Sequence, residues 1–180
     1  MTSVSSRALL AALLVASASG CSAPPAVDWR ARERDPDSPE LAGFAPEQRS
    51  VWIQRVTRVE DELAQLPDHP WAGTYRTGDG LDRNWTLRIA PEAGFTWTWA
   101  GCGGVTDRNL GSVREENGVL HLACEWPNVY EPWTSGCPET LNVVARNGYL
   151  YLVQDPEYFR REAEHGADPL RLVLVRVDDG

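Results

Sequence analysis

Lysine is absent from this 180-residue sequence, in which all 17 basic residues are Arg. Its absence excludes a Schiff-base lysine, a phosphate-loop lysine and any Ser/Lys catalytic dyad. The 26 acidic residues outnumber the basic ones and leave a formal net charge of -9. The phosphate backbone repels an acidic chain, so we do not expect nucleic acid as a partner.

Catalytic and metal-binding motifs are also scarce. The three His residues, His69, His121 and His165, form no HxH or HExxH pattern, and the sequence contains no GxSxG motif and no Gly-rich phosphate loop. We therefore expect no metal ion and no cofactor. A small hydrolase that uses loop carboxylates stays open, because two acids suffice for glycoside hydrolysis and the expected loops carry Glu125, Glu131, Asp155 and Glu157 near one rim.

Long hydrophobic runs are missing except near the beginning of the chain. ALLAALLVA is an apolar run of nine residues that follows MTSVSSR, a segment carrying one positive charge at Arg7. Such a run is too short to span a bilayer as a permanent helix and is typical of a signal peptide. The sequence therefore predicts a signal peptide over residues 1–20.

The end of this segment, Ala18, Ser19, Gly20 and Cys21, resembles the lipobox of bacterial lipoproteins. The resemblance implies cleavage before Cys21 and lipid modification of that residue, and Ser22 beside it implies sorting to the outer membrane. We therefore expect a lipid-anchored protein of the bacterial cell envelope, with the membrane as a partner. The alternative is an ordinary secretory signal followed by a chance Cys.

Two different patterns follow the anchor. Residues 21–45 are rich in Pro, Arg and acidic residues, which predicts a flexible tether. In residues 46–66 the spacing changes, and apolar residues recur every three or four positions, which predicts one amphipathic helix. We expect this helix to pack on its own domain, with a partner-binding helix as the alternative. The stripe consists of Trp52, Val56, Val59, Leu63 and Leu66.

From residue 71 the pattern is almost wholly that of β-strands, rich in aromatic and β-branched residues. The pairs Asn117-Gly118 and Asn147-Gly148 suit two-residue hairpins, and Asp155 suits the N-cap of a helix before the last strand. Successive strands alternate in direction, so the long connections share one end of the sheet. The expected strands are 71–77, 84–90, 94–100, 109–115, 119–124, 139–146, 149–154 and 170–177.

The opening WAGTYR of this eight-strand series, with short turns at one end and long loops at the other, resembles the lipocalin-like barrels. The resemblance implies a mainly β, eight-stranded antiparallel meander barrel over residues 71–177 that binds a small apolar molecule. The segment from GDGLDRN through GFTWTWAGCGG to DRNLGSV also resembles bacterial proteins whose function is not established. Its two DRN tripeptides, at 82–84 and 107–109, each come at the start of an expected strand. We expect their Asp-Arg pairs and turn-forming Asn residues to shape the turn into the strand rather than to bind a polar ligand.

Three cysteines remain once Cys21 is assigned to lipid. Cys124 ends the fifth expected strand and Cys137 precedes the sixth, its neighbour, which favours a disulfide between them. Cys102 leaves the third strand, roughly 9.6 Å from the fifth in a meander, which exceeds the usual separation. We therefore expect Cys102 to stay out of the disulfide.

The loop EWPNVYEPWTSG, over residues 125–136, places Trp126, Tyr130 and Trp133 at the long-loop end. Aromatic groups stiffened by Pro either cap the barrel or form a binding platform for an apolar or carbohydrate ligand. Trp97 and Trp99 raise the same choice between a packed core and a ligand cavity. Two hypotheses thus stand beside the hydrolase: a lipid-anchored ligand-binding protein, and a structural or partner-binding envelope lipoprotein with a filled barrel and an unknown protein partner.

Overall fold

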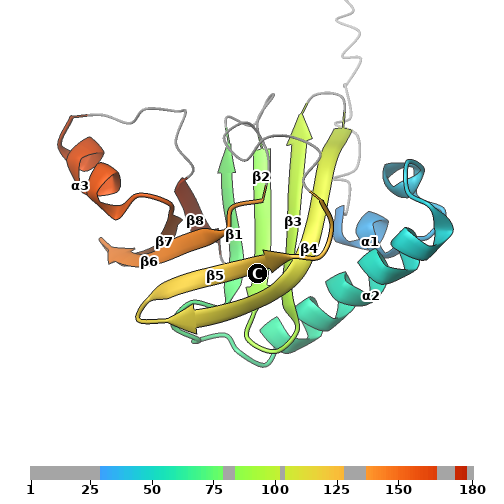
Figure 1. Cartoon of the computed structure of the whole chain (residues 1–180), viewed down its shortest axis with the longest axis horizontal. Helices are drawn as coiled ribbons and strands as arrows, with labels where there is room; N and C mark the ends of the chain where they lie inside the picture. The colour runs from blue at the N-terminus through green and yellow to red at the C-terminus, as the bar shows by residue number, and fades with distance from the viewer. Residues whose placement is uncertain (1–28, 79–83, 102–103, 128–136, 166–172, 178–180) are drawn as a thin grey trace, which may run out of the picture.

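The computed structural model describes residues 29–78, 84–101, 104–127, 137–165 and 173–177. Eight antiparallel strands follow one another around a closed barrel, in which each strand pairs with the next and β8 pairs with β1 (Figure 1). The predicted lipocalin-like meander is therefore confirmed. The strands are β1 Gly73–Gly78, β2 Asn84–Ala90, β3 Gly94–Gly101, β4 Gly104–Glu116, β5 Val119–Cys124, β6 Thr140–Arg146, β7 Tyr149–Val153 and β8 Val173–Val177.

The residues that the sequence predicted for tight turns and for a helix cap adopt those roles in the structure. Asn117 and Asn147 adopt φ angles of 54° and 51°, and the Gly after each has a φ of 80°, as a tight hairpin of this twist requires. Helix α3, Pro156–His165, begins after Asp155, whose Oδ1 accepts hydrogen bonds from the backbone N–H groups of Glu157 and Tyr158. Both predicted hairpins and the predicted N-cap are confirmed.

Strand β4 is longer than predicted, because it serves two parts of the barrel. Its first half pairs with β3 as far as Gly111, and from Gly111 onward it pairs with β5. A Cβ atom on Gly111 would collide with the carbonyl oxygen of Ala123, so only glycine allows β5 to approach this closely. Residues 104–108 are too polar for an alternation of apolar and polar positions to reveal the extra length from the sequence.

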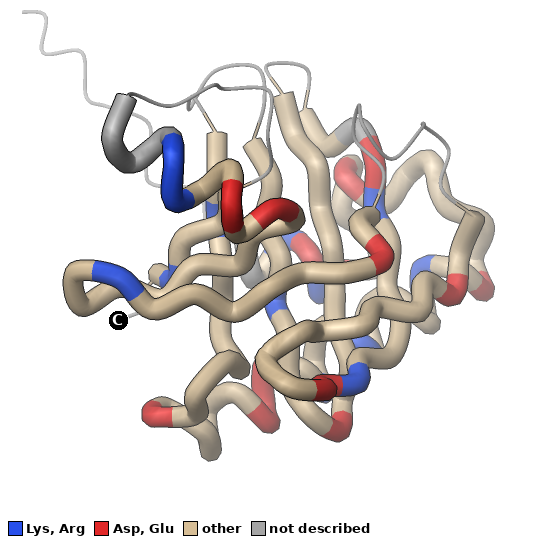
Figure 2. The backbone as a smooth tube through the Cα atoms, turned by 60° about the vertical axis from the view of Figure 1, so that its left-hand side comes forward, with Lys and Arg blue, Asp and Glu red and all other residues tan. Residues whose placement is uncertain are grey.

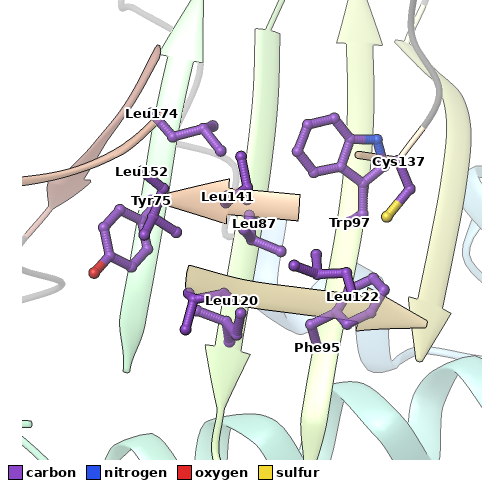
Figure 3. Packing of buried hydrophobic residues seen from close by; sticks show 11 residues of the cluster. Tyr75, Leu87, Phe95, Trp97, Leu120, Leu122, Cys137, Leu141, Leu152 and Leu174 are labelled. Atoms are coloured by element: carbon purple, nitrogen blue, oxygen red, sulfur yellow. The ribbon is translucent and has the colours of Figure 1, made fainter. Parts of the chain in front are cut away.

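The inward residues of the strands form one apolar core (Figure 3). Its fully buried members come from seven of the strands and include the aromatic residues Tyr75, Phe95 and Trp97. The core consists of Tyr75, Leu87, Ile89, Phe95, Trp97, Leu120, Leu122, Cys137, Leu141, Leu152 and Leu174.

Three short elements precede the barrel and pack on its outer surface: α1 Trp29–Arg34, the 3-10 helix η1 Pro39–Leu41, and α2 Pro46–Leu63. Helix α2 contacts β2 and β3, and it buries Trp52, Val56 and Val59 (Figure 1). The helix therefore packs on its own domain, as predicted. It ends at Leu63 rather than at residue 66, because the chain then tightens into turns, in which the Gln65 N–H bonds to the Glu62 carbonyl oxygen and the Leu66 N–H to the Leu63 carbonyl oxygen.

The prediction of a flexible tether is wrong for residues 29–45. Leu41 is completely buried beside Trp52, and the Arg49 guanidinium binds the carbonyl oxygens of Phe44 and Ala42. The segment is polar in composition, but its few apolar residues and its charged groups find partners on the barrel. Polar composition alone therefore does not distinguish a tether from a segment held by ion pairs.

Two arginines on the outer face of the barrel fix this N-terminal segment. Arg88 of β2 is 4 % exposed and pairs with Glu33 at 2.8 Å and with Glu60 at 3.6 Å. Arg108 of β4 donates a 2.8 Å hydrogen bond to the carbonyl oxygen of Glu40. Basic and acidic positions are interspersed along the described chain (Figure 2).

Candidate functional site

One end of the barrel, called the mouth below, is the end at which β1, β3, β5 and β7 finish and the next strands begin. The end of β1 and the beginning of β2 lie beside the end of β3 and the beginning of β4 at one edge of the barrel (Figure 1). The antiparallel order brings the end of β5 and the beginning of β6 to the same end. The end of β7 and the beginning of β8 lie there too, so side chains from eight strand ends are available to a ligand at the barrel mouth.

An aromatic pair lies on the inward side of this end. Trp85 of β2 is the register partner of Trp99 of β3, and their rings stack with centroids 6.5 Å apart at an interplanar angle of 18°. Both are half-buried, and Trp85 packs against the core below it. The pair therefore forms the boundary between the filled core and the mouth.

A buried carboxyl group accompanies this pair. Asp107 of β4 is the register partner of Trp99, and paired residues of adjacent strands point to the same face. Asp107 is 9 % exposed, and burial raises the pKa of its carboxyl group, although the backbone N–H of Arg108 partly offsets this effect with a 2.8 Å hydrogen bond to Oδ1. The sequence analysis assigned Asp107 to the approach to a strand and missed its place beside Trp99, because it did not predict that β4 begins as early as Gly104.

Cys124 and Cys137 also lie at this end, but no disulfide joins them in the structure. The two residues are thiols linked by a side-chain hydrogen bond, with Cys137 packed in the core. The predicted proximity is therefore present, whereas both residues are free thiols in this structure, without the predicted covalent bond. Cys102 lies outside the described residues.

A groove of about 450 Å³ lies where the regular pairing of β5 and β6 ends. Regular pairing of these strands reaches only from Val119 to His121 on β5. Beyond this point the regular ladder ends, apart from a hydrogen bond from the Leu122 N–H to the Glu139 carbonyl oxygen, and the groove is lined by residues of both segments. Its lining consists of His121, Leu122, Ala123, Cys124, Cys137, Glu139 and Thr140.

Five aromatic residues were proposed from the sequence as ligand contacts, and those that the structure describes lie in different environments. Trp97 is 1 % exposed and belongs to the packed core, so the prediction that it contacts a ligand is wrong. Trp99 lies at the mouth, as proposed. Tyr130 and Trp133 lie outside the described residues.

Trp126 does not lie at the mouth either, although the sequence proposed it for a binding platform. Its ring packs on the outer surface, with centroids 5.3 Å from Phe44 and 6.1 Å from Trp52. Asn109 holds the backbone of this residue, because its Nδ2 donates to the Trp126 carbonyl oxygen at 3.0 Å and its Oδ1 accepts from the Trp126 N–H. The loop aromatic therefore serves to dock the N-terminal segment.

The carboxylates suggested for a hydrolase serve other purposes where they are described. Asp155 caps α3, and Glu125 pairs with Arg55 of α2 on the outer surface. Glu131 lies outside the described residues. Among the described side chains, no group of three or more His, Cys, Asp or Glu residues is arranged to hold a metal ion.

In the described part of the chain, no helix combines the length and apolar character needed to cross a membrane. Residues 1–28, which include the predicted signal peptide and Cys21, lie outside it. Comparison of the chain with protein-family models, with curated proteins and with solved structures finds no match. Inference about function therefore rests on the geometry of the barrel mouth.

Proposed function

We propose that this protein is a lipid-anchored protein of the bacterial cell envelope that binds a small ligand at the mouth of its barrel. The observation that supports ligand binding is the stacked, half-buried pair of Trp85 and Trp99 beside the buried carboxyl group of Asp107. Aromatic faces bind apolar surfaces, and a carboxyl group binds hydroxyl groups. Carbohydrate is the class of ligand that offers both, ahead of a purely apolar molecule.

The proposed location in the cell envelope rests on the sequence. The signal peptide, Cys21 and Ser22 support cleavage, lipid attachment and outer-membrane sorting. A Cys21→Ser variant should lose all fatty-acid label in metabolic labelling, whereas Cys102→Ser should keep the label of the wild type. A wild-type protein that takes up no label would disprove the anchor. In an oxidising envelope we also expect the disulfide between Cys124 and Cys137 to form.

Two matched variants test the ligand site. Trp99→Ala removes an aromatic ring at the mouth, and Trp126→Ala removes a similarly half-buried ring from the outer surface. Titration with a panel of oligosaccharides, followed by calorimetry, should show binding that Trp99→Ala weakens by about 1 to 3 kcal/mol. Trp126→Ala should bind like the wild type.

The outcomes separate the two leading functions. A structural or partner-binding lipoprotein is favoured by one observation, the completely buried core that fills the barrel below the aromatic pair. If neither oligosaccharides nor fatty acids bind the wild type, ligand binding is wrong and the structural function replaces it. Binding of fatty acids alone would keep the site and change the ligand class.

A further inference from the structure

Cys124 and Cys137 lie close together just beyond the last regular pairs of β5 and β6. The register pairs His121 with Thr140, and a 2.8 Å hydrogen bond from the Leu122 N–H to the Glu139 carbonyl oxygen extends it by one residue. Two further residues in the same register place Cys124 opposite Cys137. Directly opposed residues of antiparallel strands have Cα atoms about 4.5 to 5.5 Å apart, which lies within the range of disulfides.

The two thiols differ in accessibility. Cys137 is 1 % exposed and packs among the apolar core residues, whereas Cys124 is half-buried. Figure 3 shows the Cys137 side chain within this core. Both residues line the groove between β5 and β6, which has space for a small molecule. An incoming reagent therefore meets Cys124 more readily than Cys137.

The two thiols also differ in acidity. The hydrogen bond from Cys137 lowers the pKa of Cys124, although burial and the carboxylates of Glu139 and Asp107 oppose this effect. Burial raises the pKa of Cys137, and the adjoining Cys124 raises it further. The thiolate, which is the reactive form, is thus favoured at Cys124.

We propose that Cys124 and Cys137 form a thiol–disulfide exchange site for a small disulfide that enters the groove between β5 and β6. The Cys124 thiolate attacks one sulfur of the small disulfide, forms a mixed disulfide and releases one small thiolate. Cys137 then gives up its proton to solvent, attacks the Cys124 sulfur and releases the second small thiolate. The protein loses two electrons, and the small disulfide gains them.

The product joins β5 to β6 covalently just beyond their last regular pairs. This bond would fix the edge of the groove and one side of the barrel mouth. The exchange chemistry depends only on the two thiols and their groove, and it holds whether or not the protein carries a lipid anchor or binds a ligand.

The test uses the full chain with Cys21→Ser and Cys102→Ser, reduced beforehand, with oxidised glutathione as the small disulfide. With Cys137→Ser added, one glutathione should remain attached to Cys124 in mass spectra. With Cys124→Ser added instead, the reaction should be at least about tenfold slower, because the remaining thiol is buried. The parent with both thiols should form the internal disulfide and release two reduced glutathiones for each oxidised one.

Equal reaction rates of the two single-thiol variants would overturn the assignment of Cys124 as the attacking residue. A parent that accumulates glutathione on Cys124 without resolving it would overturn the role of Cys137. If a substitution unfolds the protein, brief oxidation of the parent, acid quenching and peptide mapping still decide the matter. The first adduct must lie on Cys124, and an adduct that appears first on Cys137 refutes the proposal.

Discussion

The inner and outer faces of strands β2, β3 and β4 are both buried, but by different means. The inner face carries Leu87, Phe95 and Trp97, which pack together without charge. The outer face carries Arg88 and Arg108, which lie under the N-terminal segment and pair with its acidic residues. The comparison shows that alternation of apolar and polar residues gives the direction of a side chain and does not by itself give its exposure.

The outer face also uses aromatic residues in a different way from the inner one. The Arg108 guanidinium lies 5.5 Å from the ring centroids of both Phe44 and Trp52. Burial lowers the pKa of Arg108, and the carboxylates of Glu33, Glu40 and Asp107 counteract that effect. Cation–π contacts and ion pairs together offset the cost of removing this charge from water.

The largest effect should come from the inner face. Trp97→Ala should lower the free energy of unfolding by about 3 to 5 kcal/mol, because a completely buried indole leaves a cavity that its neighbours fill only in part. Chemical denaturation of the variant and the wild type measures the difference. Loss of less than about 1 kcal/mol would mean that the barrel interior is not the packed core described above.

The outer face should respond more to a broken charge pair than to the removal of the whole pair. Glu33→Gln leaves Arg88 with a weaker partner and should cost about 3 kcal/mol in the free energy of unfolding. The double variant Glu33→Leu with Arg88→Met should cost less than Glu33→Gln, because Glu60 keeps Arg34 as its ion-pair partner and no buried charge is left unpaired. As a surface control, Arg114→Ala removes an exposed partner of Glu116 and should cost under about 0.5 kcal/mol.

A double variant that costs as much as the sum of its two single variants would contradict this account. It would show that Glu33 and Arg88 stabilise the fold separately rather than as a pair. The contrast between a cavity on the inner face and an unpaired charge on the outer face would then disappear.

The inner face and its strands could be predicted from the sequence because period-two alternation, Asn-Gly turns and the Asp155 cap all act locally. The outer interface could not. Its contacts join residues far apart in the chain, such as Glu33 with Arg88 and Glu40 with Arg108. Polar composition hid the segment, although Leu41 and Phe44 were the apolar residues through which it packs.

The mouth was predictable only in part. Trp99 follows from its place at the end of a strand, and Cys124 and Cys137 follow from the neighbouring positions of their strands. Trp126 could not be assigned, because a loop aromatic can turn to either side of a strand. Asn109, which holds the Trp126 backbone, decides the direction, and no local pattern reveals that contact.

The smallest expected effect on the free energy of unfolding comes from the titration of Tyr75, a residue of the inner face, at alkaline pH. Tyr75 is completely buried, its hydroxyl group donates a 2.8 Å hydrogen bond to the Trp71 carbonyl oxygen, and burial raises its pKa to about 12 even though Arg176 opposes the shift. The pKa of Tyr in the unfolded chain is about 10. A raised pKa in the folded state means that the stabilisation is complete below about pH 10 and is lost as pH rises towards 12.

The wild type should therefore lose about 2 kcal/mol of unfolding free energy between about pH 9 and pH 11.5 through this group, relative to Tyr75→Phe, which lacks it. The comparison is clean because the chain has no Lys to titrate in this range, and the remaining Tyr and Cys residues are common to both proteins. Denaturant unfolding at a series of pH values supplies both curves. Parallel curves would show that the Tyr75 hydroxyl group reaches water in the folded protein, and the inner face would then be less completely closed than the outer one.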